Sequence, residues 1–259
     1  MSKDLNIVVI GGGLAGATTI KKLIKKFRSN SSCSITLIEI QEEIYLNLGS
    51  PRSLVDESFT EKCYFKTNSI FKGFPRGKLV IGNVESMDSK TVTVFINGTS
   101  SIVPYDYLVI ATGRNEEIQA DVTLDSTIPP IPNSSFLESF DKNAVNESKY
   151  IKVRPTLQIP NHNNLFSLGD VANTGAPKMV VCIDGQASLV ATNIFNHYHE
   201  KQLKSYQIPA YDTIFIGFGK QKAFGVISGL NNFLIDIVAK QGKCKDLYVG
   251  TAGAVYNTK

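Results

Sequence analysis

The first forty residues combine apolar and glycine-rich stretches in a pattern that predicts a strand, a helix and a second strand. Residues 5–10 (LNIVVI) form an apolar run of strand length, and the glycine cluster 11–16 (GGGLAG) follows at once. Apolar residues then recur at i, i+3, i+4 and i+7, which is typical of one buried helix face: Ile20, Leu23, Ile24 and Phe27. The apolar run 34–40 (SITLIEI) completes a β-α-β unit. We interpret the basic residues between 21 and 28 as the solvated side of that helix.

The middle of the chain predicts short strands followed by a buried one. Residues 78–105 resemble short antiparallel strands around Asn97-Gly98, a dipeptide typical of a two-residue hairpin turn. Residues 107–112 (YLVIAT) form another buried strand, which ends at Gly113. From 114 to 133 the chain is polar and then proline-rich (IPPIP), so we expect a connector there.

A second structured block is expected from about Ser134. Residues 164–168 predict a short strand that ends in Gly169-Asp170, and residues 179–198 predict a helix. This block supplies the second half of an α/β arrangement, because a strand and a helix again follow one another.

Residues from about 206 to the end predict short strands and one helix near 231–239. The glycines at 217–219 and 250–253 lack the strand–glycine–helix spacing of the first cluster, so we interpret them as turns. The whole pattern predicts an α/β fold with a central parallel sheet, a small antiparallel sheet and a small α+β C-terminal part.

Composition and charge narrow the class of protein. The 259 residues are 42% hydrophobic, enough for a substantial core. The balance of 27 basic to 23 acidic residues is too even to predict a nucleic-acid partner. No apolar run reaches the ~18 residues of a membrane-spanning helix, and no secretory signal is visible. The four cysteines contain no CxxC pair, which disfavours a disulfide framework, a zinc ribbon and dithiol redox chemistry. We expect a cytoplasmic protein.

The first glycine cluster has the context of a dinucleotide-binding site. Gly11 permits the tight turn, Gly13 lets backbone N–H groups approach a pyrophosphate, and Gly16 lets the helix pack close to the sheet. The helix N-terminus attracts phosphate through its partial positive charge. Glu39 ends the second strand, where a carboxylate can accept hydrogen bonds from both hydroxyls of an adenosine ribose. This site fits either NAD or FAD.

Two later stretches favour FAD. A strand ends in Ala111-Thr112-Gly113, and a second ends in Gly169-Asp170, where the glycine allows close backbone approach and the aspartate can bind ribityl hydroxyls. The following helix can direct its N-terminus at the flavin ring. The alternative interpretation of Asp170 is an N-cap or turn residue that binds no ligand.

The set GGGLAG, LIE, ATG and LFSLGD, in this order, resembles the FAD-dependent pyridine nucleotide oxidoreductases, and within them the apoptosis-inducing-factor-like group. The stretches 47–55 (NLGSPRSLV), 167–179 (SLGDVANTGAPKM) and 243–250 (KCKDLYVG) support the narrower match.

The resemblance implies a Rossmann-like domain with non-covalent FAD, NAD(P)H as electron donor, and a quinone or other small acceptor. By position, the residues implied to bind the cofactor are Gly11, Gly12, Gly13, Leu14, Ala15, Gly16, Glu39, Arg52, Val80, Thr112, Gly113 and Asp170. Lys178 either faces the flavin pyrimidine, as a possible catalytic residue, or is a surface lysine at a helix start. No metal site is expected, because His197 and His199 would point apart on a helix.

The chain departs from this family between ATG and LGD. Relatives carry a second nucleotide-binding unit there for NAD(P)H, whereas only about 50 residues separate the two motifs here, and such a unit needs on the order of 100. We therefore expect a FAD-binding domain in two segments, 1–113 and 134–205, a connector at 114–133, and a C-terminal domain at 206–259. The alternatives are a non-catalytic FAD-binding scaffold that acts through protein contacts, or a truncated isoform or gene model. Relatives with N-myristoylation carry glycine where this chain has Ser2, so only unanchored, peripheral contact with a membrane or organelle surface is expected.

Overall fold

The structure is a computed structural model that describes residues 4–115, 131–209, 213–218, 222–227 and 246–257. The chain divides into two compact units, one of Met1–Glu42 and Ile70–Gln207 and the other of Glu43–Ser69 and Ile208–Lys259. Residues 43–69, expected within the first FAD-binding segment, are thus grouped with the C-terminal residues. The helix expected near 231–239 lies outside the described residues.

The first unit is built on a five-stranded sheet in the order β13-β9-β1-β2-β5, and every pairing in it is parallel. Its strands are β1 (Leu5–Ile10), β2 (Cys33–Glu39), β5 (Gly77–Ile81), β9 (Tyr107–Ile110) and β13 (Leu165–Ser167). Ile10 pairs with Ile38 on one side and with Ile110 on the other. The carboxyl ends of the three middle strands therefore lie at one edge of the sheet.

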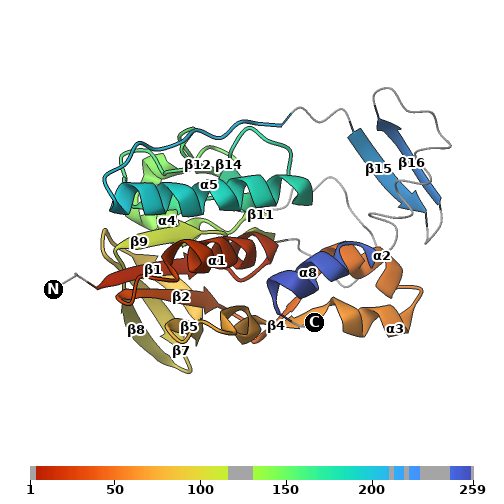
Figure 1. Ribbon diagram of the computed structural model, residues 1–259, viewed down its shortest axis with the longest axis horizontal. Coiled ribbons are helices and arrows are strands. Elements are labelled where there is room, and N and C mark those ends of the chain that lie inside the picture. The colour runs from red at the N-terminus through yellow and green to blue at the C-terminus, as the bar shows by residue number, and fades with distance from the viewer. Residues whose placement is uncertain (1–3, 116–130, 210–212, 219–221, 228–245, 258–259) are drawn as a thin grey trace. The chain divides into compact units, whose positions relative to one another are not determined.

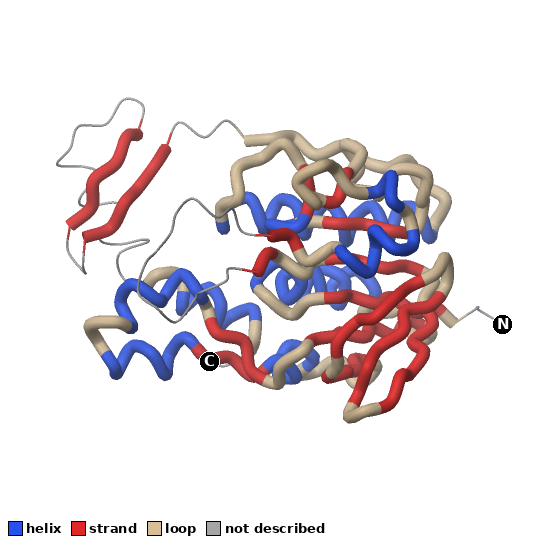
Figure 2. The backbone as a smooth tube through the Cα atoms, turned by 180° about the vertical axis from the view of Figure 1, so that it is seen from behind, coloured by secondary structure: helices blue, strands red, loops and turns tan. Residues whose placement is uncertain are grey.

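Two helices pack together on one face of this sheet, α1 (Leu14–Phe27) and α5 (Val180–Tyr198) (Figures 1 and 2). The apolar periodicity predicted one buried face on α1: Ile20, Leu23 and Phe27 are buried, and Ile24 is half-buried. The Phe27 ring also meets the ring of Phe195 edge-on, with 5.4 Å between their centroids.

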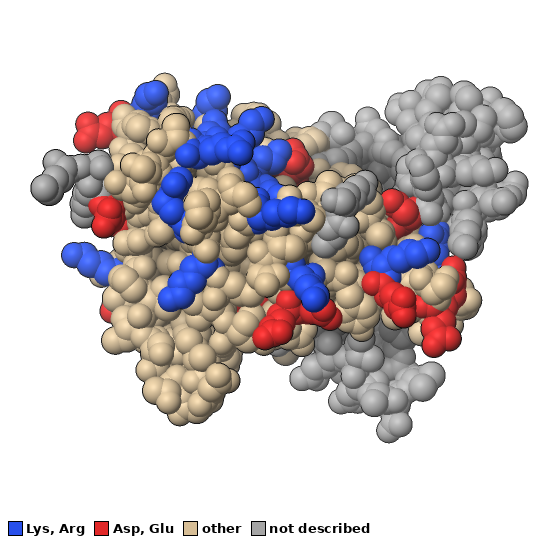
Figure 3. All heavy atoms as spheres, turned by 60° about the horizontal axis from the view of Figure 1, so that its bottom comes forward, with Lys and Arg blue, Asp and Glu red and all other residues tan. Residues whose placement is uncertain are grey.

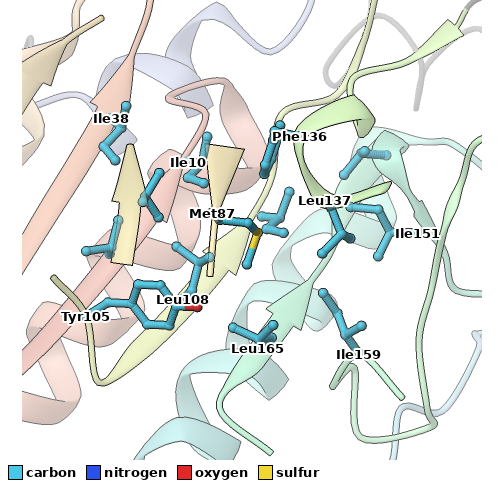
Figure 4. Close-up of a cluster of buried hydrophobic side chains, with 14 of the residues drawn as sticks. Ile10, Ile38, Met87, Tyr105, Leu108, Phe136, Leu137, Ile151, Ile159 and Leu165 are labelled. Atoms are coloured by element: carbon cyan, nitrogen blue, oxygen red, sulfur yellow. The ribbon is translucent and has the colours of Figure 1, made fainter. Parts of the chain in front are cut away.

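A three-stranded antiparallel sheet, β6 (Asn83–Met87), β7 (Thr91–Ile96) and β8 (Thr99–Pro104), lies on the opposite side of the central sheet with α4 (Ser135–Phe140) (Figure 2). Buried side chains such as Ile10, Met87 and Leu165 form the core between these layers (Figure 4). Positive φ angles at Asn97 and Gly98 confirm the predicted hairpin turn. The start of the 78–105 stretch differs from expectation, because β5 belongs to the parallel sheet.

Short elements complete the first unit. β10 (Arg114–Asn115) pairs antiparallel with β11 (Ile131–Pro132), and β12 (Ile151–Lys152) pairs parallel with β14 (Ala172–Asn173). Single 3₁₀ turns occur at η4 (Lys142–Ala144) and η5 (Gly169–Val171). The β10–β11 pairing joins the two ends of the expected connector, so the chain leaves and re-enters the unit at one place.

The second unit pairs β3 (Glu43–Tyr45) with β4 (Tyr64–Lys66), with η1 (Asn47–Gly49), α2 (Ser50–Ser53), α3 (Glu57–Thr60) and η2 (Glu61–Cys63) between them and η3 (Thr67–Phe71) after them. β15 (Thr213–Phe218) and β16 (Lys222–Ile227) form a hairpin. Helix α8 (Val249–Val255) leads to Tyr256, whose buried ring stacks on Phe65. Gly250 and Gly253 lie inside α8 and Gly217 lies inside β15, so the interpretation of these three glycines as turns is wrong.

Lysine and arginine side chains are spread over much of the face in Figure 3, with acidic side chains in smaller groups. On α1, Lys25 and Lys26 are exposed, as expected for a solvated helix face. Within the described residues, no helix is both long and apolar enough to cross a membrane.

Candidate functional site

The glycine turn between β1 and α1 uses its three motif glycines in different ways. Gly11 has φ +96°, and a Cβ there would lie 2.5 Å from the carbonyl oxygen of Ala111. A Cβ on Gly16 would meet the carbonyl oxygen of Gly11 well inside 3.0 Å, a separation that real Cβ atoms essentially never show. A Cβ on Gly13 would find no atom of the described residues within 4 Å, its two chain neighbours aside. The first and third glycines are therefore required by the fold, as predicted, whereas the second leaves space beside the turn.

Glu39 closes the turn from the end of β2. Its buried carboxylate accepts a hydrogen bond from the backbone N–H of Gly12 and another from the N–H of Ile40, at 2.7 Å. The sequence predicted a ribose-binding carboxylate, and the structure adds that the same group holds the glycine turn against β2. Each carboxylate oxygen can accept two hydrogen bonds, so Glu39 keeps capacity for ligand hydroxyls.

The segment after β13 reaches the same turn from a distant part of the sequence. The N–H of Leu168 donates to the carbonyl of Ile110, which continues the parallel pairing past the strand end. Gly169 then has φ +76°, and a Cβ on it would lie 2.9 Å from the Cβ of Ala15, at the start of α1. Asp170 follows directly in η5, one residue after the glycine that meets the start of α1.

The Ala-Thr-Gly segment at the end of β9 is held by the returning chain. The Thr112 hydroxyl donates to the carbonyl of Asn133 at 2.6 Å, and the Asn133 side-chain amide donates to the carbonyl of Thr112 at 3.1 Å. The Asn133 N–H also donates to the carbonyl of Gly113, whose φ is +67°. These bonds fix the path of the backbone into Arg114 of β10.

Sequence reasoning missed two residues of this edge. The buried side-chain oxygen of Gln186, on α5, accepts from the Gly169 N–H at 2.9 Å and so positions the loop before Asp170. Arg114 places its guanidinium Nη2 3.4 Å from a carboxylate oxygen of Asp170. Arg114 was visible as the residue after the ATG motif, whereas no local signal marks Gln186.

Lys178 is not a simple surface lysine. Its ammonium group donates to the carbonyl of Ala172, lies 3.5 Å from the carbonyl oxygen of Gly169, and sits 4.9 Å from the ring centroid of Tyr150. Burial lowers the pKa of Lys178, Asp170 opposes that shift, and the positive charge of Arg114 adds to it. Lys178, Arg114 and Asp170 therefore form one charged cluster beside the turn.

The remaining expected cofactor residues are more widely placed. Leu14–Ala15 opens α1 directly after the glycine turn. Val80 is buried in β5, paired with Ile38 of β2. Arg52 belongs to the second unit, where it is buried with its guanidinium 4.6 Å from the ring centroid of Phe59. Contact of Val80 and Arg52 with a cofactor remains a prediction.

Neither a dithiol nor a metal cluster is present in the part of the chain that the structure describes. Three cysteines are buried and unpaired there: Cys33, Cys63 and Cys182. Burial raises the pKa of Cys33 to about 12, so this thiol stays protonated. His197 is hydrogen-bonded to the hydroxyl of Tyr107 at 2.7 Å. Cys244 lies outside the described residues.

A parallel sheet whose first turn, second strand and a distant Gly-Asp loop meet at one edge is typical of a Rossmann-type dinucleotide-binding domain. Residues 5–127 match the family model described as pyridine nucleotide-disulphide oxidoreductase. Over this N-terminal stretch the chain is therefore similar to the pyridine nucleotide-disulphide oxidoreductases. Proteins of this family depend on flavin and NAD(P)H.

Two relatives share the name ferroptosis suppressor protein 1. The Homo sapiens protein is 25% identical over 147 residues, which cover 57% of this chain and 38% of the relative. The Taeniopygia guttata protein is 24% identical over 251 residues, which cover 96% of this chain and 60% of the relative. This chain therefore spans less than two thirds of the length of these relatives.

Two solved structures show the same fold. The sulfide:quinone oxidoreductase of Aquifex aeolicus matches with a TM-score of 0.65 at 16% identity, over 76% of this chain and 77% of that one. A chain of the Tetrahymena thermophila mitochondrial ATP synthase, solved as an F1Fo composite tetramer, matches with a TM-score of 0.73 at 10% identity. That match covers 100% of this chain and 97% of the other.

Proposed function

We propose that this chain binds FAD non-covalently at the carboxyl edge of its central sheet and acts as an oxidoreductase that delivers electrons to a quinone or another small acceptor. The observation that carries the proposal is the contact position of Gly169 against Ala15, which brings Asp170 to the glycine turn. The two motifs are far apart in the sequence, and a shared ligand gives a physical reason for their convergence.

The residues at this edge fit the chemical groups of FAD. The space beside Gly13 and the N-terminus of α1 suit a pyrophosphate. Glu39 suits the hydroxyls of the adenosine ribose, and Asp170 suits the ribityl hydroxyls, because a carboxylate is a strong hydrogen-bond acceptor. FAD, when bound, supplies the electron-transfer chemistry, so no protein acid or base is strictly required. The protein's part is to bind and orient the cofactor.

The connector is too short to hold a separate domain for the electron donor. Residues 116–130 lie between two paired strands, β10 and β11, whereas a nicotinamide-binding domain needs about 100 residues. We propose that NAD(P)H reduces the protein only weakly, or with a nucleotide-binding partner. Loss of a dedicated domain removes orientation of the donor, a contribution worth several kcal/mol, and so raises the KM for NAD(P)H.

A second candidate is a non-catalytic, FAD-binding scaffold. It is favoured by the match, along the whole chain, to a protein in the solved ATP synthase assembly, because that chain has this fold over nearly the same length. A protein of this kind acts through contacts with its neighbours, with FAD as a structural ligand or with none.

Purification of the full chain followed by anaerobic titration separates the two candidates. The oxidoreductase predicts a yellow protein with FAD equimolar to the chain, which NADH bleaches and a quinone re-oxidises. A scaffold with structural FAD predicts a yellow protein that dithionite bleaches and NADH does not. A colourless protein whose melting temperature does not rise with added FAD would contradict the proposed function, since any ligand of the native state must stabilise it.

A further inference from the structure

Arg114 has a buried hydrogen-bond donor that the described residues leave unused. Its Nη2 reaches one oxygen of Asp170 at 3.4 Å, a long, single-pronged ion pair. Its Nε is buried and has no hydrogen-bond partner among the described residues. Arginine has five N–H donors in a rigid fork, so this contact uses little of its capacity.

A second cation, Lys178, lies in the same charged cluster as Arg114 and Asp170. The positive charge of Arg114 acts directly on Lys178, and the Asp170 carboxylate, which pairs with Arg114, opposes that effect. An excess positive charge in a partly buried cluster is costly unless an anion joins it. The unused buried donor of Arg114 is the geometric observation, and the neighbouring cation agrees with it, since both favour a negatively charged group at this position.

An unused Nε alone would not support this conclusion. Arg154 also has a buried Nε without a partner among the described residues. Its Nη2, however, donates to the carbonyl of His162 at 3.0 Å and to the side chain of Asn163 at 3.2 Å, so it holds a loop together. Arg114 differs because, among the described residues, its guanidinium pairs with a carboxylate in the loop beside the glycine turn.

We propose that Arg114 is a phosphate-binding residue of the cofactor site, held by Asp170 until a phosphorylated ligand arrives. The proposal deepens the proposed function and rests on it. Ligand hydroxyls that bind Asp170 would compete with Arg114 for the carboxylate, and the guanidinium fork matches phosphate oxygens. Asn133 and Thr112 are hydrogen-bonded to each other, so the backbone position from which the Arg114 side chain starts is fixed. Arg114 would thus select phosphorylated flavins over riboflavin.

The test compares flavins that share the ring and the ribityl chain but differ in phosphate. Binding of FAD, FMN and riboflavin to the flavin-free full chain is measured by fluorescence quenching, for the native chain and for Arg114→Gln. One charge-assisted hydrogen bond is worth roughly a 10- to 100-fold change in affinity. We expect Arg114→Gln to weaken FAD and FMN by that factor, to leave riboflavin within about twofold, and to flatten the salt dependence of FAD binding. Arg114→Lys should restore part of the affinity.

A control variant distinguishes a specific effect of Arg114 from a general effect of charge. Arg28→Gln removes one positive charge from an exposed position after α1 and should change none of the affinities. Thermal unfolding of the flavin-free variants shows whether Arg114→Gln folds, and Arg114→Lys covers the case in which it does not. An equal loss for all three flavins, or no loss for any, would overturn the proposal. So would unchanged FAD affinity with a lowered flavin midpoint potential, because Arg114 would then act on the ring.

Binding of ADP to the native chain and to Arg114→Gln distinguishes failure of the Arg114 role from failure of the proposed function. If the native chain binds no flavin but binds ADP in an Arg114-dependent manner, the phosphate-binding role stands and the flavin assignment fails. If FAD binds and Arg114→Gln changes nothing, the flavin assignment stands and the role of Arg114 fails. If neither flavin nor ADP binds, both are wrong.

Discussion

Gly13→Val tests the use of the space beside the glycine turn. Gly13 has φ −58° and ψ 178°, angles open to any residue, so a valine meets no backbone strain. Its Cβ would meet no atom of the described residues within 4 Å, its two chain neighbours aside. The added side chain would fill only the space that we assign to the pyrophosphate. We therefore expect a folded protein that does not retain FAD.

The local structure sets the size of both effects of Gly13→Val, on stability and on FAD affinity. Gly13 is the N-cap of α1, a position where valine stabilises a helix about 1 kcal/mol less than glycine does. Valine also restricts the unfolded chain, and this loss of entropy offsets up to about 1 kcal/mol of that destabilisation. The free energy of unfolding without flavin should thus change by less than about 1 kcal/mol. Displacing the phosphate from two charge-assisted hydrogen bonds costs about 3 kcal/mol or more, roughly a 100-fold loss of FAD affinity.

Gly16→Ala is the matched control, because it adds a smaller group where the fold has no room. Its Cβ would overlap the backbone carbonyl of Gly11, which has no flexible end to move aside. We expect a loss of about 3 kcal/mol or more, or a melting temperature lower by about 6–12 °C, with or without flavin.

The assay measures the ratio of flavin to protein after purification and the melting temperature of the flavin-free proteins. Gly13→Val should melt like the native chain and be colourless. A yellow Gly13→Val with native FAD affinity would refute the assignment of the space. A Gly13→Val that unfolds as readily as Gly16→Ala would show that the space is not open.

Three further predictions concern other contacts. Gly49→Ala should lower the melting temperature by several degrees, because its Cβ would overlap the sulfur of Cys63, and Cys63→Ala should partly restore it. Glu39→Ala leaves the buried N–H of Gly12 without this acceptor, so we expect a loss of about 1–3 kcal/mol in flavin-free stability together with weaker FAD binding. The His162 side chain, 2.9 Å from Asp141, lowers the pKa of that carboxyl. The pair therefore stabilises the fold at pH values above the ordinary Asp pKa of about 3.9, and this stabilisation is lost as the pH falls through the lowered pKa of Asp141. Asp141→Asn should reduce the change in melting temperature between pH 5 and pH 2. An unchanged pH profile in that variant would contradict this linkage.

The sequence by itself determined the β-α-β unit, the roles of the first and third glycines, the hairpin at Asn97-Gly98 and the long helix α5. These features depend on residues close together in the chain, where apolar spacing and backbone freedom act directly. It also indicated Glu39 and Asp170, because Glu39 ends an apolar strand and Asp170 follows another closely, so both lie near the carboxyl edge of the sheet.

Only the tertiary structure decided which distant residues meet. It placed β5 in the parallel sheet, grouped 43–69 with the C-terminal residues, put Gly250 and Gly253 inside a helix, and joined Arg114 to Asp170. Gln186 illustrates the reason, since its contact with Gly169 depends on how α5 lies beside the strand ends. Local pattern fixes which residues are buried within an element, whereas the partner of each residue follows from the packing of the elements together.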